Sequence, residues 1–389
     1  MDRWAGDVTG NISLLTGDIR GSIPRRSTTK TIFLEGCFCF FSRPLDFVTI
    51  FRQNRRNMEH VTHISKNKQN LELRFAVLKL IREFFWSQGF TEVDTPNIVK
   101  VPGQEPYLSP MPVKVHNERG EESSGYLHTS PEYTMKKMLA VGFDKIFSLG
   151  KCYRDYESFG GTHNPEFTML EFYRTGVDMF AMMDDIEALF LFLSKRLKDY
   201  KIERLQDWTR VSMKDLWKKF VGVDLGEYLT NEKMLELCRE KNYNVKEDES
   251  YEDLFYRIFL NEIEPKLKDI GAVIIYDYPA QMAALSRLSK SDPRYAERFE
   301  VYINGIELAN AFSELTGADE QLKRLQEEQK LRRKLGKEVY EIDREFVEAV
   351  GQMPKSAGIA LGVDRLVQII TGCENIDDVI TLPASKLFL

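Results

Sequence analysis

The sequence predicts an α+β fold, because it combines a globular composition with separate helical and strand-like periodicities. Of the 389 residues, 43% are hydrophobic and 29% are charged, and 25 Phe and 16 Tyr provide aromatic side chains for a core. Apolar residues recur near the helical period over residues 71–89, and apolar and polar residues alternate over residues 90–95. We therefore expect one large mixed domain over residues 66–389.

The first 65 residues differ in character and are expected to form a leader. Over residues 1–57, Gly, Ser and Arg occur without a sustained period, and the pattern changes at the polar stretch 54–69. Two interpretations stay open: the leader is disordered, or it is an upstream extension of the reading frame with Met58 as the natural start. The residues assign it no function.

The region after the leader is predicted to start with a helix followed by short strands. The helix over residues 71–89 stops at Gly89, a residue typical of helix ends. Pro96 closes the strand over residues 90–95 at a position where no ladder donor is needed. Two more strands are expected, at residues 113–115 and 126–129.

Several helices and one buried strand are predicted in the remainder of the chain. Ser130 can cap a short helix, with Pro131 in the first turn and Glu132 favoured at the positive helix end. The other elements are amphipathic helices over residues 179–197 and 251–267 in an inserted helical region around 178–270, a buried strand over residues 272–276, and a charged, solvated helix over residues 320–338.

Charge and cysteine content favour a cytoplasmic protein without a nucleic-acid surface. A net charge of -6 is unfavourable for phosphate backbones, whose binding needs clustered Lys and Arg, so tRNA binding is not expected. The five cysteines are odd in number and mostly scattered, which indicates reduced thiols. Charges interrupt the apolar stretch 31–51 and the first residues lack a secretion pattern, so neither a membrane span nor secretion is predicted.

Residues 153–173 combine charged and aromatic side chains in a strand, loop and strand pattern that suits a ligand site. Arg154 can hold a phosphate, an acidic neighbour can orient the attacking group, and Phe167 can stack on a base. From Phe167 onward, alternate residues share one face of a strand. This spacing places Phe167, Glu171 and Tyr173 on the same side.

Two later segments, the first made of residues 299–300 and 305–314 and the second of residues 358–366, also carry groups suited to a nucleotide. Carboxylates at Glu300 and Glu307 suit Mg²⁺, which itself bridges nucleotide phosphates. The small residues of the second segment let a ligand approach the backbone, and Arg365 supplies a second fixed cation. Taken singly, each segment is more often a structural ion pair or a glycine-rich turn. Their order in the chain favours a site.

In this order the segments resemble the signature motifs of class II aminoacyl-tRNA synthetases, specifically of their lysine branch. Residues 89–96 resemble motif 1, the dimer element, residues 154–173 resemble motif 2, and residues 358–366 resemble motif 3. Residues 305–314 resemble the lysine-branch segment between motifs 2 and 3. The resemblance implies a catalytic core with an antiparallel sheet flanked by helices, a homodimer, and ATP and Mg²⁺ as cofactors.

The resemblance also implies roles in nucleotide binding. Arg154 would contact the α-phosphate, and Phe167 and Arg365 would sandwich the adenine. Glu300 and Glu307 would hold Mg²⁺, so the catalytic residues would be Arg154, Glu307 and Arg365. The implied ATP-binding set is Arg154, Asp155, Glu157, Asn164, Phe167, Glu307, Leu308, Gly362 and Arg365.

A pocket for lysine is implied in the same way. Glu314 and Tyr173 would meet the side-chain ammonium, which agrees with the need to pair a buried charge. The substrate carboxylate would then attack the α-phosphate and give an aminoacyl-adenylate and pyrophosphate. The implied substrate-binding set is Ser130, Pro131, Glu132, Glu171, Tyr173, Asn310 and Glu314.

The chain departs from the lysine-branch pattern at the acidic residue of motif 2. Lysine enzymes usually carry Arg-Asn-Glu before the loop, whereas residues 154–157 are one residue longer before His163. Whether Asp155 or Glu157 takes the acidic role therefore stays open.

Within the lysine branch, the chain resembles the shortened ligases that modify translation elongation factor P. Lysyl-tRNA synthetases place an anticodon-binding β-barrel before motif 1, but the leader shows no run of regularly spaced strands. Ala360 stands where those synthetases generally have Gly, which would reshape the floor of the amino-acid pocket. The resemblance implies transfer of lysine or β-lysine to a lysine side chain of elongation factor P, and the choice between the two amino acids stays open.

Two other functions are compatible with the sequence. One is a lysyl-tRNA synthetase-like core that charges tRNA, and the other is a catalytically silent paralogue that binds an amino acid and regulates a partner. The presence of Arg154, Glu307 and Arg365 counts against the silent paralogue, because a regulatory relic could lose them freely.

Overall fold

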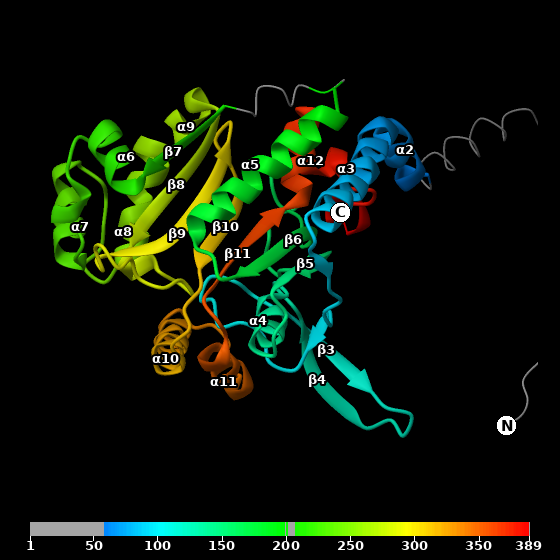
Figure 1. Ribbon diagram of the computed structural model, residues 1–389, viewed down its shortest axis with the longest axis horizontal. Coiled ribbons are helices and arrows are strands. Elements are labelled where there is room, and N and C mark those ends of the chain that lie inside the picture. Colours follow the sequence, from blue (N-terminus) through cyan, green and yellow to red (C-terminus); the bar gives the residue numbers. More distant parts are fainter. Residues whose placement is uncertain (1–57, 199, 201–206, 389) are drawn as a thin grey trace, which may run out of the picture. The chain divides into compact units, whose positions relative to one another are not determined.

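The computed structural model describes residues 58–198, 200 and 207–388 (Figure 1). The expected leader lies outside the described residues over positions 1–57. Residues 58–65 were also assigned to the leader, but helix α2 (Glu59–Lys66) forms there. The ring nitrogens of His60 and His63 lie 2.9 and 3.2 Å from the carbonyl oxygens of Lys386 and Ile380. These contacts tie α2 to the end of the folded domain, so that domain starts ahead of residue 66.

An eight-stranded sheet forms the centre of the domain, in the order β1-β5-β6-β11-β10-β9-β8-β7. Neighbouring strands are antiparallel except for the edge pairs β1 with β5 and β7 with β8, which are parallel. The predicted antiparallel sheet flanked by helices is thereby confirmed. The strands are β1 (Thr91–Glu92), β5 (Lys145–Tyr153), β6 (Glu166–Thr175), β7 (Trp208–Ser212), β8 (Ala272–Pro279), β9 (Tyr295–Ile303), β10 (Ile306–Ser313) and β11 (Ser356–Gly362).

A second, three-stranded sheet and a set of helices surround the large sheet. The small sheet is ordered β2 (Ile98–Val99), β4 (Glu122–Leu127), β3 (Met111–His116), and its β3–β4 hairpin projects from the domain in Figure 1. The α-helices that follow α2 are α3 (Lys68–Ser87), α4 (Glu132–Ala140), α5 (Met179–Arg196), α6 (Met213–Phe220), α7 (Asn231–Glu240), α8 (Tyr251–Ile258), α9 (Glu264–Ile270), α10 (Ala318–Lys334), α11 (Arg344–Gln352), α12 (Val363–Thr371) and α13 (Ala384–Leu387).

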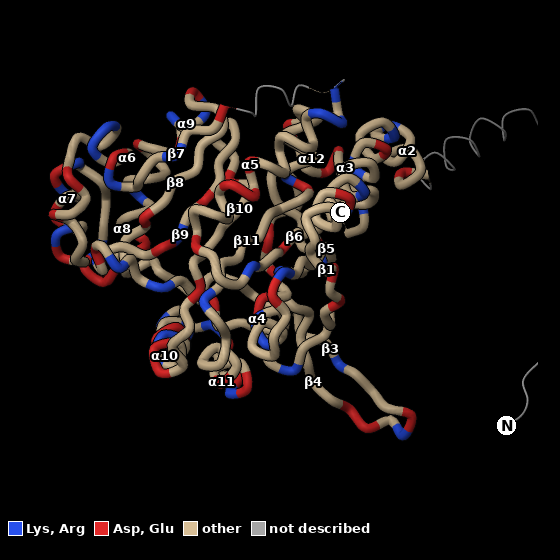
Figure 2. Tube along the Cα trace, in the orientation of Figure 1, with Lys and Arg blue, Asp and Glu red and all other residues tan. Residues whose placement is uncertain are grey.

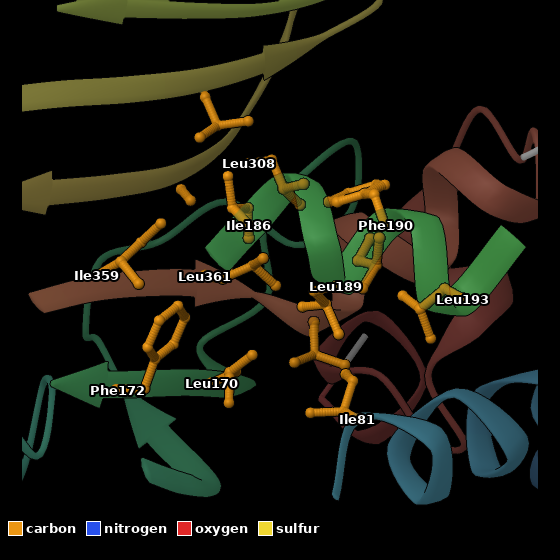
Figure 3. Close-up of a cluster of buried hydrophobic side chains, with 14 of the residues drawn as sticks. Ile81, Leu170, Phe172, Ile186, Leu189, Phe190, Leu193, Leu308, Ile359 and Leu361 are labelled. Atoms are coloured by element: carbon orange, nitrogen blue, oxygen red, sulfur yellow. The ribbon is translucent and has the colours of Figure 1, made fainter. Parts of the chain in front are cut away.

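The main hydrophobic core lies between one face of the large sheet and helices α3, α5 and α12. Figure 3 shows Ile81 of α3 and Leu189 of α5 directed toward Leu170 of β6 and Leu361 of β11. All four side chains are buried, and burying each apolar side chain contributes roughly 1.5–3 kcal/mol. Because strand residues alternate between faces, this packing leaves the intervening residues of β6 and β11 on the opposite face.

A second core explains the helical region that the sequence placed around residues 178–270. Helices α6 to α9 pack with β8 and β9 around Trp217, Phe255 and Tyr302. Helix α5 instead covers the main core, and β7 is the edge strand of the large sheet. Helices α6 to α9, which form this second core, therefore span residues 213–270. This segment is shorter than the insertion expected around residues 178–270.

Most predicted elements form, and the differences have local causes. The expected strand over residues 90–95 shrinks to β1. The expected helix over residues 251–267 contains a π-helical turn, Phe259–Ile263, just before Pro265. Pro265 lacks the N–H that would continue the α-helical ladder, which accounts for the interruption.

Three smaller expectations are also decided by the structure. Ser130 does not cap α4 directly: Pro131 precedes the first helical residue, and the Ser130 hydroxyl accepts a hydrogen bond from the Glu132 N–H at 3.2 Å. Cys152, Cys238 and Cys373 are free thiols, as predicted, whereas Cys37 and Cys39 lie outside the described residues. No helix in the described part of the chain is long and apolar enough to cross a membrane.

Candidate active site

A cavity of about 400 Å³ opens on the face of the large sheet opposite the main core. Alternate residues of β6 face it, namely Phe167, Met169, Glu171 and Tyr173, whereas Leu170 and Phe172 pack in the core. The prediction that Phe167, Glu171 and Tyr173 share one face is confirmed. The predicted site residues that line the cavity are Ser130, Glu132, Arg154, Glu157, Asn164, Phe167, Glu171, Tyr173, Glu307, Leu308, Asn310, Glu314, Gly362 and Arg365.

Three predicted site residues, Pro131, Asp155 and Glu300, do not line this cavity. Glu300 is 2% exposed and binds other protein groups with both carboxylate oxygens. One oxygen accepts from the Arg298 guanidinium at 2.6 Å, and the other accepts from the Tyr278 and Tyr302 hydroxyls at 2.6 and 2.8 Å. The predicted use of Glu300 as a metal ligand does not fit these contacts. Its carboxylate holds Arg298 in place.

The extra residue of motif 2 decides which carboxylate reaches the cavity. Tyr156 adopts a left-handed backbone conformation with φ of 60°, and its side chain is 91% exposed. This outward turn accommodates one additional residue. Glu157 then lines the cavity, 4.0 Å from the ring of His163, whereas Asp155 accepts a hydrogen bond from the Tyr156 N–H outside it. The placement favours Glu157 for the acidic role.

Arg154 and Phe167 lie together at the end of the cavity expected to bind the nucleotide. The guanidinium of Arg154 lies 4.9 Å from the centre of the Phe167 ring. The Nε atom of Arg154 is buried and meets no hydrogen-bond acceptor among the described residues. A buried cationic donor without a partner is costly, so an anionic group fits this position well.

Arg365 is fixed on the other side of the same end. It donates to the carbonyl oxygens of Thr162 and Glu307 at 3.2 and 2.8 Å, and it lies 2.9 Å from the His163 ring nitrogen. The carboxylate of Glu307 lies 3.7 Å from its guanidinium. A guanidinium held at three points presents its planar face in one orientation, which suits stacking on a base.

A buried ion pair and several hydrogen bonds fix the motif 2 and motif 3 segments, which line the nucleotide end of the cavity. Asp364 forms a buried ion pair with Arg74 and accepts from the Thr168 N–H at 2.8 Å. The Asn164 amide donates to the Glu166 carbonyl at 2.6 Å and accepts from the Ala384 N–H at 2.9 Å. Asn164 therefore lines the cavity while its side chain holds the motif 2 loop and the C-terminal segment.

A metal ion in this cavity would need phosphate oxygens of the nucleotide among its ligands. In the described ranges, no three Asp, Glu, His or Cys side chains gather closely enough to form a metal site. Glu307 lines the cavity with a side chain that is 43% exposed. A single carboxylate plus phosphate oxygens matches the way proteins bind Mg²⁺ with nucleotides.

The other end of the cavity contains three carboxylates, of which two are fully buried. Glu171 and Glu314 are 2% and 1% exposed, and Glu132 lies beside them. The Tyr173 hydroxyl donates to Glu171 at 2.6 Å. A side chain at Gly358 would clash with the Tyr173 ring and with Glu314, because a Cβ there would lie 2.2 and 2.8 Å from them.

Burial raises the pKa of Glu171 and of Glu314 above the ordinary value. For Glu314 the pKa is raised to about 7, because desolvation and the nearby Glu132 outweigh the attraction of Lys136. For Glu171 the pKa is raised well above 4.5, through burial and then through Glu132. Carboxyl groups held in this way are suited to a ligand that brings positive charge.

Sequence reasoning missed several groups at the site. Lys136 lies between Glu132 and Glu314, and its position four residues after Glu132 on a helix was an available signal. Glu105, Glu252, Arg298 and Glu328 also line the cavity, and they come from segments that carry no motif. Arg332 of α10 is 1% exposed and donates to the Glu105 carbonyl at 2.7 Å, so α10 is not the wholly solvated helix expected.

The chain is similar over most of its length to synthetases and to protein-modifying ligases. Residues 51–386 match the family of class II tRNA synthetases (D, K and N). An elongation factor P–(R)-β-lysine ligase of Histophilus somni is 39% identical over 319 residues, 82% of this chain and 95% of that protein. The corresponding ligase of Yersinia enterocolitica is 37% identical over 320 residues, 82% of this chain and 95% of that protein.

A tRNA-charging enzyme is also among the similar proteins. A lysine–tRNA ligase of Listeria welshimeri is 31% identical over 404 aligned residues, which cover 98% of this chain and 77% of that protein.

Proposed function

The chain belongs to the class II tRNA synthetase family (D, K and N), and from that membership we propose that it is an ATP-dependent lysine–protein ligase. It activates lysine or β-lysine as an adenylate and transfers it to a lysine side chain of elongation factor P. Because that acceptor is a translation factor, we expect the reaction in the cytoplasm. The cavity carries this proposal most directly, because it joins three carboxylates at one end to an arginine at the other whose buried Nε meets no acceptor among the described residues.

Activation of the amino acid needs positioning and charge neutralisation more than proton transfer. The carboxylates Glu132, Glu171 and Glu314 hold the ammonium groups and leave the substrate carboxylate directed toward Arg154. Arg154 and Arg365 neutralise charge on the triphosphate as the carboxylate attacks the α-phosphate and pyrophosphate leaves. Class II synthetase-like ligases use ATP with a divalent metal ion, and Glu307 is the residue suited to hold Mg²⁺ beside the phosphates.

Transfer completes the proposed reaction. The uncharged ε-amine of the acceptor lysine attacks the carbonyl carbon of the adenylate, and the bond from that carbon to the phosphate oxygen breaks. AMP leaves, an amide forms, and the attacking nitrogen loses one proton.

Charging of tRNA is a second candidate, favoured by one observation. The lysine–tRNA ligase relative aligns with 98% of this chain, so it also covers the segment ahead of the catalytic domain. Figure 2 shows acidic and basic residues interspersed along α10 and along the helices α6 to α8, and the net charge of -6 is unfavourable for binding to phosphate backbones. Transfer to a protein therefore remains the preferred reaction.

Residues of the pocket floor set the choice between lysine and β-lysine. Ala360 lines the cavity and pairs in the sheet register with Glu171 on one side and Asn310 on the other. We expect Ala360→Gly to shift the ratio of kcat/KM for β-lysine and α-lysine toward α-lysine by about tenfold, since one methyl group changes pocket fit by that order. Pyrophosphate exchange with each amino acid measures this ratio. An unchanged ratio would contradict a role for Ala360 in selection.

Binding of lysine is expected to depend on pH. Because the folded pKa of Glu314 is about 7, its carboxyl group is largely protonated below pH 7, and an ammonium ligand must displace that proton. The KM for lysine should therefore fall by up to about tenfold per pH unit as the pH rises toward 7. The same raised pKa stabilises the fold at low pH, and this contribution is lost as the pH rises from 4.5 through about 7. A KM for lysine that stays constant between pH 6 and 8 would contradict the assignment of Glu314 to ammonium binding.

We also propose a homodimer formed beside motif 1. Strand β1 is an edge strand of the large sheet, and Phe75 and Trp86 of α3 are 55% and 54% exposed. Exposed edges and large apolar side chains favour association with another chain. We expect Trp86→Glu to lower the sedimentation coefficient from that of a dimer toward that of a monomer, with Phe180→Glu, an exposed aromatic on α5, as the matched control.

The activation step can be tested without an acceptor. The protein, ATP, Mg²⁺ and labelled pyrophosphate should give labelled ATP when lysine or β-lysine is added, but not with leucine. Absence of exchange with both diamino acids would refute adenylate formation. Exchange with leucine would refute the assignment of the carboxylates to amino-acid recognition.

A further inference from the structure

Lys136 is a buried residue that forms ion pairs with two of the carboxylates of the cavity. Lys136 lies one helical turn after Glu132 on α4, and its side chain is completely buried. Its Nζ atom lies 2.6 Å from Glu132 Oε1 and 2.6 Å from Glu314 Oε2. Lys136 does not line the cavity itself, so it acts on a ligand only through these two carboxylates.

The charge of Lys136 is maintained by its partners. Burial alone would lower its pKa, but the attraction of Glu132 and Glu314 outweighs that effect and raises the pKa above the ordinary value of 10.5. Lys136 is therefore an ammonium ion at every physiological pH. When a cationic ligand keeps Glu132, Glu171 and Glu314 ionised, these three carboxylates and the Lys136 ammonium leave two negative charges at this end of the cavity.

Other cations near this end are already engaged elsewhere. Arg298 forms a buried ion pair with Glu300, and Arg287 pairs with Glu297 at 2.7 Å. Glu105, Glu252 and Glu328 also line the cavity, but Lys136 forms its ion pairs with Glu132 and Glu314. The group considered for the charge balance with a bound cation is therefore Glu132, Glu314 and Lys136, which are in ion-pair contact, together with Glu171.

We propose that Lys136 is a positioning residue that sets this balance and thereby selects a substrate with two ammonium groups. The inference rests on the proposed function, because it concerns the same amino-acid pocket. A diamino acid brings two positive charges to this end and leaves the site neutral, whereas a monoamino acid leaves one carboxylate unpaired in a buried environment. Lys136 also holds Glu132 and Glu314 together, although their like charges repel each other.

A double-mutant cycle tests this charge balance through binding. The ligands are lysine, with two ammonium groups, and 6-aminohexanoate, with one, and calorimetry gives the ratio of their dissociation constants. Glu132→Gln leaves a balance of one negative charge, so the preference for lysine should fall about tenfold. The double variant Lys136→Met/Glu132→Gln restores the balance of two, so its preference should return to within about threefold of the original protein.

The neighbouring lysine provides the control. Lys137 pairs with Asp343 and Glu345 outside the cavity, at 2.8 and 3.1 Å, so Lys137→Met should leave the ligand preference unchanged. Thermal melting of each variant shows whether it is folded. If the double variant keeps the low preference of Glu132→Gln, Lys136 has only a structural role and the inference is overturned, whereas failure of the ligase proposal would show instead as absent pyrophosphate exchange in the original protein.

Discussion

Replacing Glu314 with Gln is expected to raise the KM for lysine about a hundredfold and to leave the KM for ATP within about twofold. The side chain is 1% exposed and belongs to the end of the cavity away from Arg154 and Phe167. Gln keeps the shape but loses the charge that pairs with an ammonium, and a buried charge-assisted contact contributes about 1.5–3 kcal/mol. The two KM values from pyrophosphate exchange measure the effect.

The matched control for this substitution is Glu118→Gln. Glu118 lies in the connection between β3 and β4, and its side chain is 83% exposed, so neither KM should change. Glu314→Gln also removes one partner of buried Lys136, and a lower melting temperature is expected alongside the kinetic change. Equal rises of both KM values would contradict the assignment of Glu314 to the amino-acid end.

Replacing Arg154 with Ala is expected to lower kcat for pyrophosphate exchange about a thousandfold. The buried Nε of Arg154 has no acceptor in the described part of the protein, and its guanidinium stacks on Phe167 at the nucleotide end. Removing a preorganised charge that faces the reacting phosphate costs two to three orders of magnitude in typical enzymes. Arg154→Lys should recover only part of the rate, because an ammonium lacks the planar fork of a guanidinium.

The control for the arginine is Arg294→Ala. Arg294 pairs with Asp292 at 2.7 Å at the surface, where the two side chains are 56% and 36% exposed. An exposed pair contributes about 0–1 kcal/mol to stability, so neither folding nor exchange should change measurably. A fall in exchange of less than about tenfold in Arg154→Ala would remove this residue from the catalytic set.

Local periodicity predicted the parts of the site that depend on one strand. Phe167, Glu171 and Tyr173 face the cavity together because side chains alternate along β6. The helices α3 and α5 also form where the helical period indicated. Such features need only neighbouring residues, so one sequence is enough to expect them.

Features that depend on partners from distant segments were not predictable. Glu300 of β9 accepts a hydrogen bond from Tyr278, which the pairing of β8 with β9 brings beside it, in addition to those from Arg298 and Tyr302 of its own strand. Lys136 meets Glu314 from the far end of the sequence. No periodicity within one segment carries this information.

Backbone conformation accounts for a further difference. The left-handed backbone of Tyr156 lets Glu157 rather than Asp155 reach the cavity, although an L-residue rarely adopts it without a tertiary cause. The sequence showed an extra residue in the motif but not where the chain would turn. The structure therefore favours Glu157 over Asp155 for the acidic role of motif 2, whereas residue spacing left both possible.

The most direct test of the proposed ligase is the transfer of labelled lysine and β-lysine, with ATP and Mg²⁺, to purified elongation factor P and to bulk tRNA in parallel reactions. The account predicts label on a lysine side chain of elongation factor P and none on tRNA, with the label lost in the Arg154→Ala variant. Label on tRNA with none on elongation factor P would contradict it and identify the chain as a tRNA-charging enzyme.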